Sequence, residues 1–310
     1  MGNKLIVTAA PHITGPDTTQ KIMQRVCIAL LPTLIASILI FGINSLILTV
    51  ITVAACMFFE WGYCKLVGRE VPVGDFSAAV TGVLLAFNLP ATLPWWMAIV
   101  GAFIAIVIVK QLFGGLGYNV ANPAIVARIA LAMGFASRMA NYPHPANGID
   151  ALASATPLAV SGQMGAADYV TLLLGNHGGV LGETCAITLL LGGIYLIATK
   201  VISPVIPVTY LATVAVLSAV SGHDPIVQLL SGGLMLGAFF MATDYVTSPT
   251  TNKGKLVFGI GLGIITCAIR FLGTMNEGVS FAILLMNLLV PYIEILTRQD
   301  RLGIAKAKKP

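Results

Sequence analysis

Long apolar runs alternate with short polar connections along almost the whole chain. Ten runs are predicted to form membrane helices, over approximately 22–41, 43–62, 76–89, 95–112, 122–139, 184–199, 204–220, 226–243, 256–271 and 279–297. Many approach the roughly 20 residues that an α-helix needs to cross a bilayer. Asn88-Leu89-Pro90 and Asn122-Pro123 end or begin two of the runs and predict broken or tilted helices around an interior cavity. The pattern predicts an all-α polytopic membrane protein.

The composition excludes a soluble globular protein. Of the 310 residues, 57% are hydrophobic and 9% are charged, and the charged share is about a third of that in soluble domains. So few charges cannot cover a large core with polar surface. The five cysteines form no C-x-x-C pair and the four histidines do not cluster, so no metal site, iron–sulfur cluster or disulfide set is expected.

The basic residues predict the orientation in the membrane. If the N-terminus is cytoplasmic, all 17 basic residues except Arg128, Arg138 and Arg270 lie in cytoplasmic segments or at cytoplasmic helix ends. This asymmetry satisfies the positive-inside rule, so both termini are predicted to be cytoplasmic. The first 21 residues are polar and show no cleavable signal peptide. The net charge of +5 then reports topology, and no nucleic-acid partner is needed to explain it.

The same topology divides the chain into two halves. Residues 1–139 form a five-helix half, 140–183 an outer connection, and 184–310 a second five-helix half with a basic cytoplasmic tail. Five spans precede the connection, so the halves enter the membrane from opposite sides. A faint repeat relates the region from Ala86 to Ile125 to the region from Ala238 to Ile283. We therefore expect two inverted five-helix repeats, an arrangement that commonly places a ligand at the repeat interface.

A short polar stretch from Asp150 to Leu158 stands in the middle of the connection. Pro157 pushes the residue before it, Thr156, out of helical geometry into an extended conformation. The neighbours Ala153, Ser154 and Ala155 are small enough to let a bulky group approach the Thr156 hydroxyl. By itself this pattern is also that of an ordinary loop threonine.

A few polar residues lie in or beside the apolar runs. Arg128, inside a span, either neutralises a bound anion such as a phosphate or pairs with a helix-end carbonyl. Asp244, at the cytoplasmic end of the eighth span, either contacts a hard cation such as sodium or caps the turn that follows. Arg270 is expected to snorkel to the outer surface. Interhelical contacts are expected for Asn88, Asn119, Asn122 and Asn287.

Several motifs together carry a resemblance to a known family. The chain resembles the D subunits of Rnf complexes, the membrane ferredoxin:NAD oxidoreductases of bacteria, and more distantly the B subunits of sodium-pumping NADH:quinone reductases. The likeness covers nearly the whole length. Its motifs are Ala10-Pro11-His12-Ile13, Gly114 to Asn119 with Asn122-Pro123-Ala124, Ser154 to Leu158, Gly182-Glu183-Thr184, Phe239 to Asp244 with Thr247 to Thr250, and Phe281 to Asn287.

The resemblance implies that Thr156 carries FMN through a phosphoester bond. A flavin transferase that takes FMN from FAD would install it. Asp150, Ala155 and Thr156 match the acceptor pattern, whereas Ala153 stands where serine is usual and Ser154 where glycine is usual. The predicted FMN site consists of Thr156, Asp150, Ser154, Ala155, Pro157 and Arg128. The resemblance also implies a noncovalent riboflavin and a place in the bacterial cytoplasmic membrane, with Thr156 on the outer side.

The function expected from the resemblance is that of a translocase subunit, active only within its complex. It would relay electrons through FMN and contribute to sodium or proton movement. The expected partners are an outer-side FMN subunit, iron–sulfur membrane subunits and membrane lipid. No Walker loop, Rossmann fingerprint or catalytic triad occurs, so NAD and ferredoxin chemistry would belong to those partners. A passive small-solute transporter or channel and a cofactor-free scaffold remain the alternatives.

Overall fold

The chain folds as a bundle of helices. The computed structural model describes residues 17–142, 166–175, 177–183, 185–273 and 278–298, and none of these forms a β-strand. Four helices are apolar and long enough to cross a membrane, and five shorter helices are also apolar. The long ones are α1 (Thr19–Phe41), α2 (Ile43–Val67), α12 (Asn252–Leu272) and α13 (Val279–Thr297).

The first group of helices runs from α1 to α6. After α2 come the 3-10 turn η1 (Val73–Asp75), α3 (Ser77–Phe87), α4 (Trp95–Phe103) with its π-helical continuation η2 (Ile104–Gln111), α5 (Pro123–Gly134) and α6 (Ala136–Met139). Gly42, with φ of 82°, makes the one-residue turn between α1 and α2. Asn122 caps α5 by accepting from the backbone N–H of Ala124, and Pro123 is its first residue, at the start of the run predicted over 122–139.

The second group runs from α7 to α13. Before α12 and α13 it contains α7 (Ala166–Leu174), α8 (Ala186–Ala198), α9 (Val205–Val220), α10 (Pro225–Leu230), α11 (Leu234–Leu236) and the π-helix η4 (Gly237–Met241). The sequence predicted one span over 226–243, and this is wrong in detail. The span is interrupted at 231–233, because Gly232 and Gly233 both have φ of 68° and turn the chain between α10 and α11.

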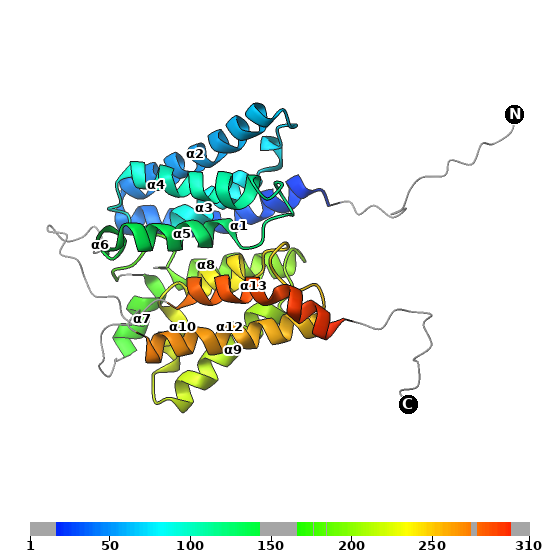
Figure 1. The fold of residues 1–310 in the computed structure, drawn as a ribbon. Coiled ribbons are helices and arrows are strands. Elements are labelled where there is room, and N and C mark those ends of the chain that lie inside the picture. The colour runs from blue at the N-terminus through cyan, green and yellow to red at the C-terminus, as the bar shows by residue number, and fades with distance from the viewer. Residues whose placement is uncertain (1–16, 143–165, 176, 184, 274–277, 299–310) are drawn as a thin grey trace, which may run out of the picture.

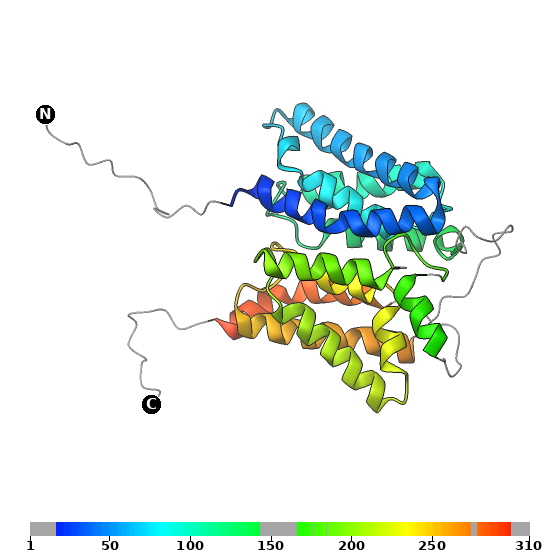
Figure 2. The same ribbon diagram turned by 180° about the vertical axis from the view of Figure 1, so that it is seen from behind.

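The two groups lie against each other along their helices. Figure 1 shows α1 to α5 above α8 to α13, and the reverse view keeps this arrangement (Figure 2). Helix α1 packs against α8, and α5 packs against α13. The contact between α1 and α8 is close because Gly192 of α8 faces the backbone of Ala29, which lies 2.3 Å from where a Cβ on Gly192 would stand.

The two ends of the bundle differ. Helix α1 begins and α13 ends at the same end, which we call the N/C end (Figure 1). The opposite end carries α6 and α7 and is called the connection end. Among the described basic residues, Arg138 and Arg270 lie at the connection end and Arg128 lies inside α5, while the others lie at the N/C end: Lys21, Arg25, Lys65, Arg69, Lys110, Lys200, Lys253, Lys255 and Arg298.

Candidate functional site

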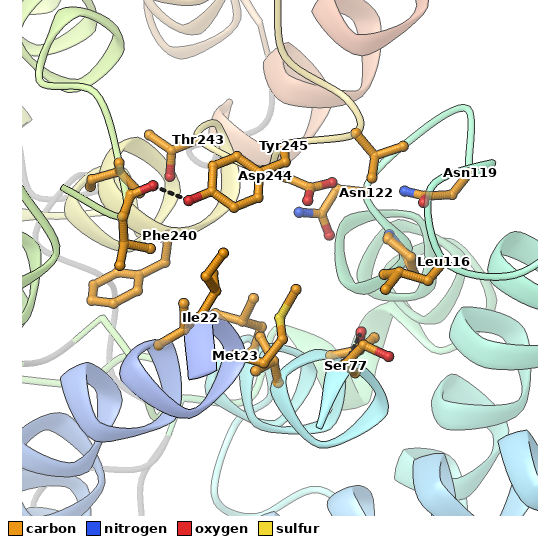
Figure 3. Close-up of a pocket in the computed structure, with 18 of the residues that line it drawn as sticks. Ile22, Met23, Ser77, Leu116, Asn119, Asn122, Phe240, Thr243, Asp244 and Tyr245 are labelled. Atoms are coloured by element: carbon orange, nitrogen blue, oxygen red, sulfur yellow. Dashed lines mark hydrogen bonds between the residues drawn. The ribbon is translucent and has the colours of Figure 1, made fainter. Parts of the chain in front are cut away.

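A cavity opens between the two groups of helices at the N/C end. Its empty space, counting the open mouth, is about 790 Å³. The first group contributes residues of α1, α3, η2 and the segment before α5, and the second contributes the end of α8, η4 and the segment after it (Figure 3). Both groups build this cavity together, and we treat it as the candidate functional site.

One side of the cavity is apolar. Ile22 and Met23 of α1 lie opposite Tyr245 and Phe240 of the second group (Figure 3). The Tyr245 hydroxyl donates to the carbonyl of Val201, which ties the segment after η4 to the connection between α8 and α9. These flat and branched side chains offer an apolar surface to a ring-shaped ligand.

The other side of the cavity carries amide and carboxyl groups. Asn119, Asn122 and Asp244 lie together there (Figure 3). The Asn122 amide donates to the Met241 carbonyl at 3.3 Å and so joins the two groups of helices. Asn119 donates to the Ala121 carbonyl at 3.1 Å and also bonds to Asp244. The expected interhelical role is confirmed for Asn122.

Asp244 closes the turn that follows η4. Its Oδ2 accepts from the Thr247 hydroxyl at 3.0 Å, and the backbone N–H groups of Tyr245 and Val246 also donate to its carboxylate. This is the turn-capping arrangement that the sequence left as one alternative. The cation contact at Asp244 stays a prediction.

A buried ion pair in the first group reaches the cavity through Lys110, one of the lining residues. The Lys110 Nζ lies 2.6 Å from Glu60 Oε1 and 2.6 Å from Ser77 Oγ, and Gln111 Nε2 donates to the same Glu60 oxygen at 3.0 Å. Glu60 is 0% and Lys110 2% exposed. Both Lys110 and Gln111 end the π-helix η2, a rare conformation that recurs at functional sites.

This pair was missed by sequence reasoning, which assigned Lys110 only to the charged membrane surface. Lys110 does lie at the N/C end, but its side chain turns inward and is buried. A usable signal was present: Glu60 interrupts an apolar run, and an acid at such a position needs a partner. The partner is 50 residues away, and only the packing of α2 against η2 identifies it.

Arg128 lies elsewhere, between the two groups. Its Nη1 donates to Ser280 Oγ at 2.7 Å and its Nη2 to Glu183 Oε1 at 3.4 Å, with both charged side chains buried. These contacts join α5, the segment before α8, and α13. Arg128 does not line the cavity. The contact between Arg128 and FMN stays a prediction.

Arg270 does not snorkel to the surface, so that expectation is wrong. Its guanidinium donates to the carbonyls of Gln228 at 2.6 Å, Ser231 at 3.0 Å and Gly232 at 3.3 Å. These carbonyls end α10 and have no helical partner of their own, because the helix stops there. Arg270 therefore stabilises the break in the eighth span.

The predicted FMN attachment site cannot be compared with this geometry. Thr156, Asp150, Ser154, Ala155 and Pro157 lie outside the described residues. Within the described ranges no group of three or more histidine, cysteine or acidic side chains could hold a metal ion. The five cysteines are free, and all but Cys27 are buried.

The fold and the cavity define a multi-pass, all-helical membrane protein with an open hollow between two helix groups. Comparison with known sequences then gives the family. The profile of the NQR2, RnfD, RnfE family matches residues 6–303. The chain belongs to this family.

Curated relatives agree over almost the full length. The chain is 46% identical to the D subunit of the Na(+)-translocating ferredoxin:NAD(+) oxidoreductase complex of Acetobacterium woodii, over 98% of the chain and 97% of the relative. It is 38% identical to the D subunit of the proton-translocating ferredoxin:NAD(+) oxidoreductase complex of Clostridium ljungdahlii, over 97% of each. It is also 38% identical to the D subunit of the ion-translocating oxidoreductase complex of Stutzerimonas stutzeri, over 95% of each.

Proposed function

We propose that this chain is the D subunit of an ion-translocating ferredoxin:NAD oxidoreductase and relays electrons through flavins. The observation that carries the proposal is the full-length similarity to D subunits of such complexes, at 46% and 38% identity. As in those relatives, the chain would work as one subunit of a larger assembly. One named relative translocates sodium and the other protons, so either ion is compatible with the proposal.

In this proposal FMN is attached to Thr156 by a phosphoester bond. The support is the sequence pattern, in which Asp150, Ala155 and Thr156 stand at the spacing of the attachment motif, with Ser154 and Pro157 beside them. A flavin transferase would load the site. The attachment needs a side-chain hydroxyl to form the phosphoester bond. Serine also carries a hydroxyl, so serine could partly replace Thr156.

The cavity at the N/C end is proposed to hold the noncovalent flavin, riboflavin. Its residues suit an isoalloxazine ring, which is apolar on its faces and forms hydrogen bonds along its edges. Ile22, Met23 and Phe240 would contact the faces, and Asn119 and Asn122 would reach the edges. When bound, this group would accept and release electrons; the chain orients it and keeps water from its faces.

The membrane orientation is part of the proposal. Most described basic residues lie at the N/C end, so this end would face the cytoplasm and the connection end, with Thr156, the outer side. The pairing of α1 with α8 and of α5 with α13 supports two inverted five-helix repeats, since equivalent helices would meet about such an axis. Electrons would then pass from the outer to the cytoplasmic side, and Asp244 would contact the coupled cation.

The FMN proposal has a direct test. The full chain is purified from cells that contain the flavin transferase, separated on a denaturing gel and viewed under ultraviolet light. A fluorescent band that disappears in Thr156→Ala and weakens in Thr156→Ser supports the attachment. A dark wild-type band contradicts it and favours a cofactor-free scaffold.

A second measurement addresses the cavity. Acid extraction of the folded Thr156→Ala chain should release a flavin, because this variant keeps the noncovalent site and lacks the covalent one. High-performance chromatography then separates riboflavin from FMN. A Thr156→Ala chain that binds no flavin, even after incubation with riboflavin, would contradict the proposed role of the cavity.

A further inference from the structure

The buried pair of Lys110 and Glu60 is arranged with its positive member, Lys110, toward the cavity. Lys110 and Ser77 both line the cavity, whereas Glu60 is completely buried on α2 and does not. Ser77 is labelled among the lining residues in Figure 3. The pair is neutral in sum, but its charges stand at different distances from a bound ligand. Its dipole therefore presents a positive potential to the cavity.

The surrounding contacts hold the ammonium group at this place. Lys110 Nζ donates to Glu60 Oε1 and Ser77 Oγ, both at 2.6 Å, and Ser77 Oγ in turn donates to Asp75 Oδ1 at 2.6 Å. Gln111 gives Glu60 its second donor. The network spans α2, η1, α3 and η2, so Lys110 cannot move far without breaking its bonds to α2 and α3. A fixed buried charge is also weakly screened by salt.

The pair costs free energy that packing alone does not explain. Two charges taken into a protein interior lose hydration, and Glu60 Oε2 is buried without a hydrogen-bond partner. An apolar pair of similar volume would fill the same space without this cost. Retention of the pair is therefore consistent with an electrostatic task at the cavity.

The other ionisable groups that line the cavity belong to the second helix group, whereas Asp75, which accepts from Ser77, does not line it. Asp244 and Tyr245 lie on the far side from Ser77 (Figure 3). The Asp244 carboxylate accepts hydrogen bonds from Thr247 and Asn119. Lys110 is the cationic side chain among the residues that line the cavity.

We infer that Lys110, held by Glu60 and Ser77, raises the reduction potential of the redox ring bound in the cavity. Lys110 does so by stabilising the negative charge that one added electron brings. No covalent bond forms or breaks: a reduced flavin of the proposed relay loses the electron, the bound ring gains it, and Lys110 keeps its protons. The inference rests on the proposed function, because it requires a redox ring in this cavity. Lys110 acts on that ring through its charge, and Glu60 holds Lys110 in place.

Two single variants should shift the midpoint potential in opposite directions, and the double variant serves as a reference. Lys110→Met leaves Glu60 as a lone negative charge and should lower the midpoint potential of the bound flavin. Glu60→Gln leaves Lys110 as a lone positive charge and should raise it. The double variant Lys110→Met with Glu60→Gln removes the dipole and should fall between the two single variants. A loss of structure would move both single variants in the same direction, so the sign separates the electrostatic role from damage.

The measurement uses the purified full chain carrying Thr156→Ala, so that the noncovalent flavin is the only one present. Spectroelectrochemical titration gives the potential, and acid extraction gives the flavin content of each variant. Ser218→Ala, a buried change on α9 where the hydroxyl bonds within its own helix, serves as the control and should leave the potential unchanged.

The outcomes separate the two proposals. If the parent chain contains no flavin and takes up none, the proposed cavity cofactor fails. If flavin is present but the two single variants shift its potential in the same direction or not at all, the inference about Lys110 is overturned while the cavity cofactor stands. Should Lys110→Met fail to accumulate, Glu60→Gln decides alone, since an unchanged or lowered potential contradicts the inference.

Discussion

Arg128 on α5 and Glu183 in the segment before α8 form a buried ion pair, with Nη2 and Oε1 3.4 Å apart. The two residues belong to different helix groups, and Ser280 on α13 takes the other nitrogen of the same guanidinium at 2.7 Å. The pair therefore fastens the two groups to each other in the interior of the bundle. Its charges are shielded from solvent, so each member depends on the other.

Removal of one member of this pair should destabilise the protein more than removal of both. Arg128→Met leaves the Glu183 carboxylate buried without the Arg128 guanidinium, at a cost of about 3–5 kcal/mol. The double variant Arg128→Met with Glu183→Gln leaves no charge and should recover most of this loss. The detergent-solubilised chains are heated, and size-exclusion chromatography measures the fraction that stays folded at each temperature. This gives the difference in thermal stability between the single and double variants. A double variant no more stable than Arg128→Met would show that the loss of stability does not come from the broken ion pair.

The contact between α1 and α8 predicts the effect of a single methyl group. In Gly192→Ala the new Cβ would meet the Ala29 carbonyl oxygen at 2.3 Å and the Phe240 ring at 2.9 Å. Such overpacking costs about 1–3 kcal/mol, and the melting temperature should fall by several degrees. Gly62→Ala on α2 is the matched control, because nothing lies within 4 Å of its Cβ position. A Gly192→Ala protein as stable as Gly62→Ala would contradict the close approach of the two helices.

The break in the eighth span should depend on Arg270. Arg270→Gln removes the guanidinium that reaches the carbonyls of Gln228, Ser231 and Gly232. Backbone amides around 228–236 should then exchange hydrogen several-fold faster, which mass spectrometry measures. Arg138→Gln, an exposed change at the same end of the bundle, should leave the exchange unchanged. Equal exchange in the two variants would argue against a capping role for Arg270.

The contact between α7 and α10 should weaken in acid. The hydrogen bond from the Tyr169 hydroxyl is the main cause that holds the pKa of Asp224 below its ordinary value of 3.8. A group whose pKa is lowered by folding contributes stability above its unfolded pKa and loses it as the pH falls through the folded pKa. The contact is therefore expected to hold near neutral pH and to loosen below 3.8.

Tyr169→Phe removes this hydrogen bond and should make the stability of the contact less dependent on acid. Pepsin cleavage of α7, followed between about pH 2 and about pH 5, compares the two proteins. Because Asp224 is only partly buried, screening by solvent makes the effect small. Tyr195→Phe, at the other end of the bundle, is the control. Identical cleavage profiles for Tyr169→Phe and wild type would contradict the assignment.

The cation proposal at Asp244 makes a separate prediction. Asp244→Asn keeps the shape of the side chain but removes its charge, so the sodium concentration for half-maximal electron transfer by the whole complex should rise about tenfold, equivalent to about 1.4 kcal/mol. Thr247→Val removes one bond of the same turn and keeps the carboxylate, so it should change sodium dependence less. Unaltered sodium dependence in a stable Asp244→Asn complex would leave Asp244 as a turn cap.

The positions of most helices follow from the sequence, because an apolar run long enough to cross a bilayer has to satisfy its backbone groups within itself. The start of α5 at Asn122-Pro123 is an example, since the cap and the proline act locally. The motifs also led to the family. The attachment of FMN to Thr156 rests on the same motifs and awaits its experiment.

The contacts between distant residues were decided by the tertiary structure. Lys110 pairs with Glu60, which is 50 positions away in the sequence. Arg270 donates to carbonyls at the end of α10, whereas the sequence predicted that it would reach the outer surface. The cavity arises because residues of α1, α3, η2, α8 and η4 meet at one end of the bundle. Apolar periodicity reports what each segment does alone, whereas a buried charge takes its partner from whichever helix packs beside it, and that choice depends on the whole fold.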